Sequence, residues 1–194
     1  MTQLMLFPLS STVLPSGKMK LRIFEPRYKR MVKTCCEHNL TFGMCLVDRS
    51  AGRSTLSQCG TEVKIIDFDV LPDGLLGITV QGVQRFTIEQ IALEEDGLRL
   101  ATVQPLSPWP QAELPEQESY LGKQLEQVYA QFPQLGELYP QRLYADANWV
   151  TQRWLEILPL SVQQFEQFAG HADCTNGLNF LSQVVEDDSA RVKH

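Results

Sequence analysis

The sequence lacks several features that define common protein classes. No Cys-x-x-Cys pair occurs and the number of cysteines is odd, so neither a disulfide framework nor a zinc site of paired cysteines is expected. No run of 18 apolar residues is present, which argues against a membrane-spanning helix. The first residues carry no basic stretch and are interrupted by Pro8, so we expect no signal peptide. We therefore expect a cytoplasmic protein with buried free thiols at Cys35, Cys36, Cys45, Cys59 and Cys174.

Signatures of catalysis are also missing. The chain has no Gly-x4-Gly-Lys-Ser/Thr loop that would hold nucleotide phosphates. Cys35 and His38 have helical spacing, but a nucleophile and base normally need a third orienting group, and the sequence offers none. We therefore expect no catalytic residue, no metal and no cofactor, and the protein is not expected to be an enzyme. A hydrolase remains the least supported alternative.

Charge is unevenly distributed along the chain. The formal net charge is −6, from 17 Lys and Arg against 23 Asp and Glu. Residues 1–53 hold nine basic and three acidic side chains, a sum of +6, so residues 54–194 carry −12. The acidic total disfavours general nucleic-acid binding. We expect the basic helix and strand of the early segment to find carboxylate neighbours beyond residue 54, in particular Lys29, Arg30 or Lys33.

The first half of the chain reads mainly as strands. Alternation of Met19, Leu21 and Ile23 with basic residues predicts a strand with one buried face. A helix is predicted from Pro26 to about His38 because its apolar residues fall on one helical face; they are Tyr28, Met31, Val32 and Cys35. Further strands are expected at 41–47, 60–70 with Phe68 inward, 76–81, 85–93 and 98–103, with a break at Gly82.

The second half reads as helices. Prolines at 105, 108, 110 and 115 interrupt regular structure, and helical periodicity follows from Leu121 onward. Asp146 is a predicted N-cap, and Ser161 with Gln164 forms a capping-box pattern. The last residues, 187–194, are expected to fray. Strands followed by helices indicate an α+β fold, with a β-rich domain at 1–108 and a helical subdomain at 109–194.

Several motifs in the β-rich part carry a family resemblance. They are Leu6-Phe7-Pro8-Leu9, Leu14-Pro15, Ile23-Phe24-Glu25-Pro26-Arg27-Tyr28, Phe42-Gly43, Gly60-Thr61, Asp73-Gly74, and Gly82 with Arg85-Phe86. On these residues, the chain resembles the N-terminal, substrate-binding domain of Lon proteases. The resemblance implies a PUA-like β pseudo-barrel followed by a C-terminal helical bundle. The chain resembles a free-standing form of this domain, without the ATPase and peptidase domains. Ser16 and Lys20 depart from the family's usual pattern.

The resemblance and the residue types together suggest candidate polypeptide-binding or motif residues. These are Phe24, Glu25, Arg27, Tyr28, Arg85, Phe86 and Trp109. The Glu25–Arg27 pair, Arg85 and Trp109 each have a structural alternative. Arg27 would tie the helix to the barrel through a pair with Glu25, Arg85 would lie at the barrel rim, and Trp109 would pack the proline-rich linker rather than anchor a partner.

Two functions follow as hypotheses. The first is a non-enzymatic module that binds unfolded or extended polypeptide segments, or a partner protein, in an apolar groove between barrel and helices, with strand addition at a barrel edge. A role as an adaptor or regulator of proteolysis rests on analogy. The alternative is an RNA-binding PUA-like protein that uses the basic face formed by Lys18, Lys20, Arg22, Lys29, Arg30 and Lys33. No aromatic residue is interleaved on that face, as stacking with single-stranded bases requires.

Overall fold

The computed structural model describes residues 2–49 and 54–185. These residues form two compact units, one made of residues 1–107 with 160–170 and the other of residues 108–159 with the chain from 171 onward. The expected frayed tail and part of the polar loop at 48–53 lie outside the described residues. The expected boundary between residues 108 and 109 stays a prediction.

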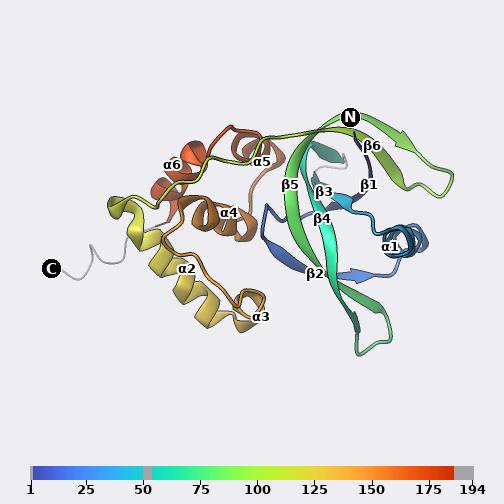
Figure 1. Cartoon of the computed structure of the whole chain (residues 1–194), viewed down its shortest axis with the longest axis horizontal. Coiled ribbons are helices and arrows are strands. Elements are labelled where there is room, and N and C mark those ends of the chain that lie inside the picture. Colours follow the sequence, from blue (N-terminus) through green and yellow to red (C-terminus); the bar gives the residue numbers. More distant parts are fainter. Residues whose placement is uncertain (1, 50–53, 186–194) are drawn as a thin grey trace. The chain divides into compact units, whose positions relative to one another are not determined.

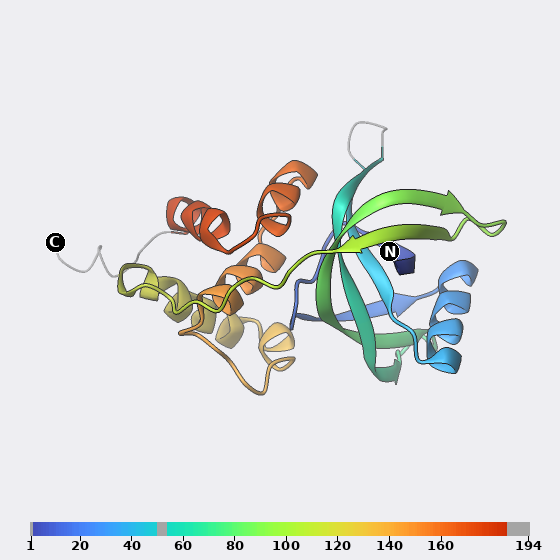
Figure 2. The same cartoon turned by 45° about the horizontal axis from the view of Figure 1, so that its top comes forward.

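The first unit contains the six strands that the described residues form, and Figure 1 labels them. They are β1 (Thr2–Leu9), β2 (Lys18–Ile23), β3 (Phe42–Asp48), β4 (Thr55–Val70), β5 (Leu76–Leu93) and β6 (Arg99–Pro105). The order in the sheet is β2-β5-β4-β3-β1-β6, and β5 also pairs with β6. Five strands therefore pair in a ring, and β2 is added to the first half of β5 (Figure 2). Only β1 and β3 pair in parallel among the described strands.

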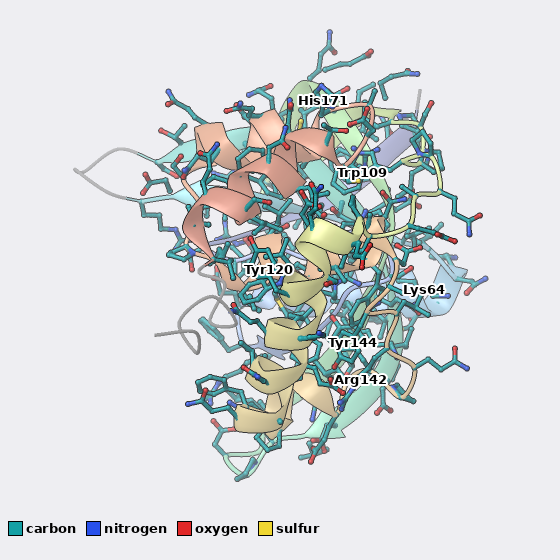
Figure 3. All side chains as sticks on the ribbon, turned by 90° about the vertical axis from the view of Figure 1, so that its left-hand side faces the viewer. Lys64, Trp109, Tyr120, Arg142, Tyr144 and His171 are labelled. Atoms are coloured by element: carbon teal, nitrogen blue, oxygen red, sulfur yellow. The ribbon has the colours of Figure 1, made fainter. Side chains whose placement is uncertain are left out.

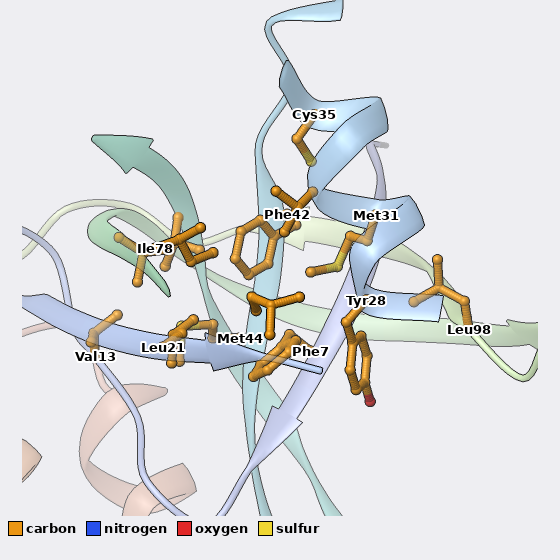
Figure 4. Packing of buried hydrophobic residues seen from close by; sticks show 14 residues of the cluster. Phe7, Val13, Leu21, Tyr28, Met31, Cys35, Phe42, Met44, Ile78 and Leu98 are labelled. Atoms are coloured by element: carbon orange, nitrogen blue, oxygen red, sulfur yellow. The ribbon is translucent and has the colours of Figure 1, made fainter. Parts of the chain in front are cut away.

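A single early helix, α1 (Pro26–His38), covers one apolar side of this sheet. Its buried residues are the four that the periodicity selected, Tyr28, Met31, Val32 and Cys35. They pack against apolar side chains of β1, β2, β3, β4 and β5 in one core cluster (Figure 4). Asn39 ends the helix in the left-handed conformation, which asparagine tolerates better than most residues. The predicted helix and its limits are confirmed.

Strand β5 differs from its prediction because it runs unbroken through Gly82. A Cβ at this position would lie 2.1 Å from the carbonyl oxygen of Leu14, so glycine permits close backbone approach rather than ending the strand. The N–H of Ser16 donates to Gly82 O, and the N–H of Gly82 donates to Gly17 O. The turn that precedes β2 is thereby fixed to the middle of β5.

Residues 160–170 return to the first unit through α5 (Val162–Ala169). The expected capping box is present, because Ser161 accepts from the N–H of Gln164 and the Gln164 side chain accepts from the N–H of Ser161. A backbone N–H of β4, that of Gln58, donates to Glu166 Oε1 at 2.5 Å. Helix α5 therefore belongs to the β-rich unit although it is far from it in sequence.

The second unit is helical. It contains η2 (Glu116–Glu118), α2 (Ser119–Gln131), α3 (Pro133–Gly136), α4 (Ala147–Ile157) and α6 (Thr175–Val184). Its core is rich in aromatic residues, and the ring centroids of Tyr129 and Tyr139 lie 5.6 Å apart. Asp146 caps α4 as expected, with its carboxylate accepting from the N–H of Trp149 at 2.7 Å. The α+β fold class is confirmed.

Candidate functional site

The most specific motif, residues 23–28, forms the junction between β2 and α1. Arg27 lies 2.6 Å from the Glu25 carboxylate, donates to the carbonyl of Gly97 at 3.1 Å, and places its guanidinium carbon 4.8 Å from the centre of the Tyr28 ring. Tyr28 is buried against Phe7. These contacts hold α1 to the loop before β6, so most of the motif serves packing.

Phe24 is the exception within that motif. Its side chain is 58% exposed, and it follows Ile23, which pairs with Leu76 at the start of β5. The motif therefore presents one large apolar side chain to solvent, beside the turn that joins β4 to β5.

Arg85 and Phe86 are neighbours in β5 and are both buried, with their side chains on opposite faces of the strand. Phe86 is buried in a second core cluster with residues of β1, β3 and β6. Arg85 is buried as well, and its guanidinium donates to the carbonyls of Ala169 and Ser107, each at 2.5 Å. Burial lowers the pKa of Arg85. Its two charge-assisted bonds hold the chain at the two places where it leaves this unit, at Ser107 and at the end of the returning helix α5.

Trp109 belongs to the helical unit and is buried. Its indole N–H donates to the carbonyl of His171 at 2.9 Å, and Figure 3 shows the two residues near one another. Asn148 likewise donates to the carbonyl of Pro110 at 2.8 Å. The proline-rich segment is thus fixed to the helical unit by side-chain donors, and Trp109 is not offered to solvent as an anchor.

The expected basic face is divided by ion pairs. Arg30 binds two carboxylates near β6, with its Nε 2.7 Å from Asp96 Oδ2 and its Nη2 against Glu94. The hydrogen bond from Arg30 is the largest cause that lowers the pKa of Asp96, and the bond from the backbone N–H of Leu98 is the next. This confirms the expected carboxylate neighbours from beyond residue 54.

Two further basic residues of that face have acidic partners. Arg22 pairs with Asp73 in the β4–β5 turn, and Lys33 pairs with Glu37 on α1 at 3.7 Å. The six basic residues therefore do not form one uncompensated surface.

The Cys35–His38 pair has no catalytic environment. Cys35 is buried, and burial raises the pKa of its thiol to about 11, whereas a nucleophilic cysteine needs a lowered pKa. Cys36 is exposed, contrary to the expectation that all five thiols are buried. Within residues 2–49 and 54–185, no cluster of His, Cys, Asp or Glu is arranged to hold a metal. No helix in that part is long and apolar enough to cross a membrane.

One part of β4 has a different environment from the rest. Strand β3 begins at Phe42, opposite Val63, and from residue 64 onward β4 pairs with β5 alone among the described strands. We call residues 64–70 the open segment. The β4–β5 turn that follows it is the lowest part of the β-rich unit in Figure 1.

The open segment exposes apolar side chains. Phe68 is opposite Ile78 and Val70 is opposite Leu76, so both point to the same side of the sheet as the core residues of β5. Even so, Phe68 is 53% and Val70 is 76% exposed. The expectation that Phe68 points inward is right for the face and wrong for burial, because the core does not extend this far.

The opposite side of the same hairpin is polar and hollowed. A cavity of about 300 Å³ lies there, lined in part by Lys20 and Arg22 of β2 and by Asp67 and Asp69 of β4. Leu71 lies over Gly77 at this hollow, 3.0 Å from where a Cβ would be. Among the described residues, the carboxylates of Asp67 and Asp69 form no ion pair.

Comparison with known proteins shows the family of the chain. The model of the ATP-dependent protease La (LON) substrate-binding domain matches residues 3–169. The chain belongs to this family. The match covers β1 through α5, and so includes both the open segment and the returning helix of the β-rich unit. The family model describes the substrate-binding domain of Lon and neither its ATPase nor its peptidase domain.

Solved Lon N-terminal domains have the same fold. A crystal structure of a Lon N-terminal domain protein from Xanthomonas campestris is 32% identical, with a TM-score of 0.75, covering 96% of this chain and 100% of that one. The N-terminal domain of the Mycobacterium avium complex Lon protease is 15% identical, with a TM-score of 0.60, covering 94% of this chain and 97% of that one. The second similarity supports the fold alone.

Sequence reasoning about this Lon substrate-binding domain missed the open segment as a site. Its residues were expected to form an ordinary strand, and Asp67, Phe68, Asp69 and Val70 were not among the candidates. The available signal was their alternation of acidic and apolar residues. This is the pattern of an ordinary half-buried strand, so it does not indicate that the apolar side is exposed.

Proposed function

We propose that this chain is a non-enzymatic module that binds unfolded or extended polypeptide through the apolar side of the open segment. The observation that carries the proposal is the exposure of Phe68 and Val70 on a sheet face that elsewhere forms the core. Large apolar side chains exposed together mark interaction surfaces more often than isolated ones. Membership in the Lon substrate-binding family supports polypeptide as the ligand class.

The finer classification is part of the same proposal. The ring of paired strands supports a PUA-like pseudo-barrel, and the helices of the second unit support a C-terminal bundle. A role as an adaptor or regulator of proteolysis, in the cytoplasm, is consistent with the family and with five free cysteines. Among the earlier candidates, Phe24 is the one that the proposal retains as a contact residue.

The RNA alternative is not favoured. Arg22, Arg30 and Lys33 each have a carboxylate partner, so fewer cations remain to release counterions from a phosphate backbone. Binding to mixed RNAs at low salt is expected to be absent, and replacing Lys18 and Lys20 by Glu is expected to change nothing in that assay.

The test is titration of a fluorescently labelled, permanently unfolded model protein, such as reduced and carboxymethylated α-lactalbumin, with the full chain. We expect saturable binding in the range of tens of micromolar or tighter. The double variant Phe68→Ser, Val70→Ser is expected to weaken it about tenfold, because two contacts each lose apolar burial.

A matched control uses the other end of the same sheet. Ile91 and Leu93 of β5 are 42% and 69% exposed, so Ile91→Ser with Leu93→Ser removes a similar apolar area elsewhere. This variant should bind as the wild type does. No binding by the wild type, or equal loss in both double variants, would refute the proposal.

A further inference from the structure

The open segment has a free backbone edge as well as an apolar face. The N–H of Leu71 donates to the carbonyl of Leu75 at 2.9 Å. In an antiparallel pair, hydrogen-bonded and non-hydrogen-bonded residue pairs alternate, so this bond fixes which residues of β4 are hydrogen-bonded to β5. In that alternation, Asp67 and Asp69 exchange hydrogen bonds with β5. Phe68 and Val70 therefore direct their N–H and C=O groups away from β5 and toward the open edge.

One of these outward groups already has a partner within β4. The N–H of Phe68 donates to Oδ1 of Asp67, its neighbour in sequence, at 2.9 Å. A side chain that satisfies an edge donor in this way is readily replaced by the carbonyl of an incoming strand, because that carbonyl makes an equivalent bond and frees the carboxylate.

The two sides of the edge differ in chemistry. Phe68 and Val70 lie on the apolar side, whereas Asp67 and Asp69 lie on the polar side next to the cavity. An added strand presents alternate side chains to these two sides. Its complement is therefore apolar at one set of positions and positively charged at the other, since side chains directly opposite in neighbouring strands interact.

Strand β2 has no such edge. It also pairs with β5 alone among the described strands, but its apolar residues Leu21 and Ile23 are buried in the core, and its other side carries Lys18, Lys20 and Arg22. Lysine-rich edges resist strand addition. The apolar and acidic features coincide at the open segment of β4.

We propose that the open segment binds an extended polypeptide by β-strand addition, and that it prefers segments in which apolar residues alternate with lysine or arginine. The inference rests on the proposed function and specifies its binding mode and substrate class. In the antiparallel direction, the residue opposite Phe68 forms a hydrogen-bonded pair with it. The apolar residues of the ligand then direct their own N–H groups toward β4, and the basic residues direct theirs away.

This geometry can be tested with peptides that have the same side chains and differ only in which backbone N–H groups can donate. The probe is a labelled nine-residue peptide of alternating Val and Lys, prepared in two further forms that carry backbone N-methyl groups either on all Val or on all Lys. For an antiparallel strand, methylation on Val is expected to weaken binding more than about tenfold, and methylation on Lys to have little effect. The reverse result also supports strand addition and makes the strand parallel, because parallel pairing exchanges the two sets of N–H groups.

Equal affinity of the two methylated peptides, or no binding of the parent peptide, would overturn the inference. If the unfolded model protein still binds in a manner that depends on Phe68 and Val70, the proposed function survives such a result. If neither probe binds, both fail.

The charge preference has its own control variants. Asp67→Asn with Asp69→Asn is expected to weaken the Val–Lys peptide about fivefold to tenfold, and to strengthen or leave unchanged a Val–Glu peptide. The asparagine oxygen still accepts from the N–H of Phe68, so the edge is kept. Glu89→Gln with Glu95→Gln removes two exposed carboxylates elsewhere and is expected to change neither affinity. Equal weakening by both pairs would assign the effect to net charge and overturn the preference.

Discussion

The two parts of β4 differ sharply although they are one strand. Residues 59–63 lie between β3 and β5, and Val63 is fully buried. Residues 64–70 keep β5 and lack β3, and Val70 is mostly exposed. Both parts carry apolar residues on the face that the core uses. A third strand, rather than the composition of β4, therefore decides where the core ends and where a binding surface begins.

The largest expected effect concerns Arg85 of β5, which is paired with Thr61 in the part of β4 that lies between β3 and β5. Arg85→Met removes the donors to Ala169 and Ser107, and leaves the buried carbonyl of Ala169 unsatisfied. We expect a loss of about 4 kcal/mol in the free energy of unfolding, measured by urea denaturation. Lys64→Met, in the open segment, should change it by less than about 0.5 kcal/mol. Similar values for the two variants would remove the distinction.

A glycine supplies the next test. At Gly82, a methyl group would meet the backbone of Leu14 at 2.1 Å, so Gly82→Ala is expected to cost about 3 kcal/mol by the same measurement. Gly74, in the turn after the open segment, has φ of +78° and no atom within 4 Å of an added Cβ. Gly74→Ala should cost about 1 kcal/mol, for backbone strain alone. A larger loss at Gly74 would contradict the comparison.

The most direct comparison uses the same substitution twice in β4. Val63→Ala creates a cavity in the core and is expected to cost about 2 kcal/mol. Val70→Ala is expected to cost less than about 0.5 kcal/mol, because little apolar area is lost from a largely exposed side chain. Polypeptide binding should show the opposite ranking, with Val70→Ala the weaker binder and folded Val63→Ala close to the wild type.

The smallest expected effect concerns the ion pair between Arg30 and Asp96. The pKa of Asp96 is lowered in the folded state, chiefly by Arg30, so its contribution to stability is present above the unfolded pKa of about 4 and is lost as the pH falls through the folded pKa. Arg30→Ala should therefore cause a small loss of stability at pH 7 that disappears in strong acid. Lys29→Ala is the control and should leave the acid part of the pH–stability curve unchanged.

Local signals predicted much of this fold. Helix α1 was predicted to its ends because Pro26 begins it, Asn39 ends it, and its apolar face has a 3.6-residue period. The caps at Asp146 and Ser161 were predicted because side-chain oxygens accept from helix N–H groups a fixed number of residues away. These features depend on neighbours in the sequence.

The parts that sequence reasoning missed depend on distant contacts. Strand β1 was not predicted, since Leu6 and Phe7 are buried on both of its faces and no alternation remains. The break expected at Gly82 is absent. Glycine stands there because the carbonyl of Leu14, distant in sequence, approaches too closely for a side chain. The candidate site was missed for the same reason: where β3 stops beside β4 is a property of pairing, and no residue in the open segment encodes it.

Arg85 also has a topological consequence. The chain leaves the β-rich unit at Ser107 and comes back through α5 to Ala169, and one guanidinium binds both points. Residues 108–159 are an excursion into the helical unit, and α5 at its end is part of the β-rich unit, so one side chain binds the start of the excursion and the helix that follows it. Since the entropy of closing a loop grows only with the logarithm of its length, lengthening or shortening residues 108–159 should change the stability of the β-rich unit little, provided that α5 is kept.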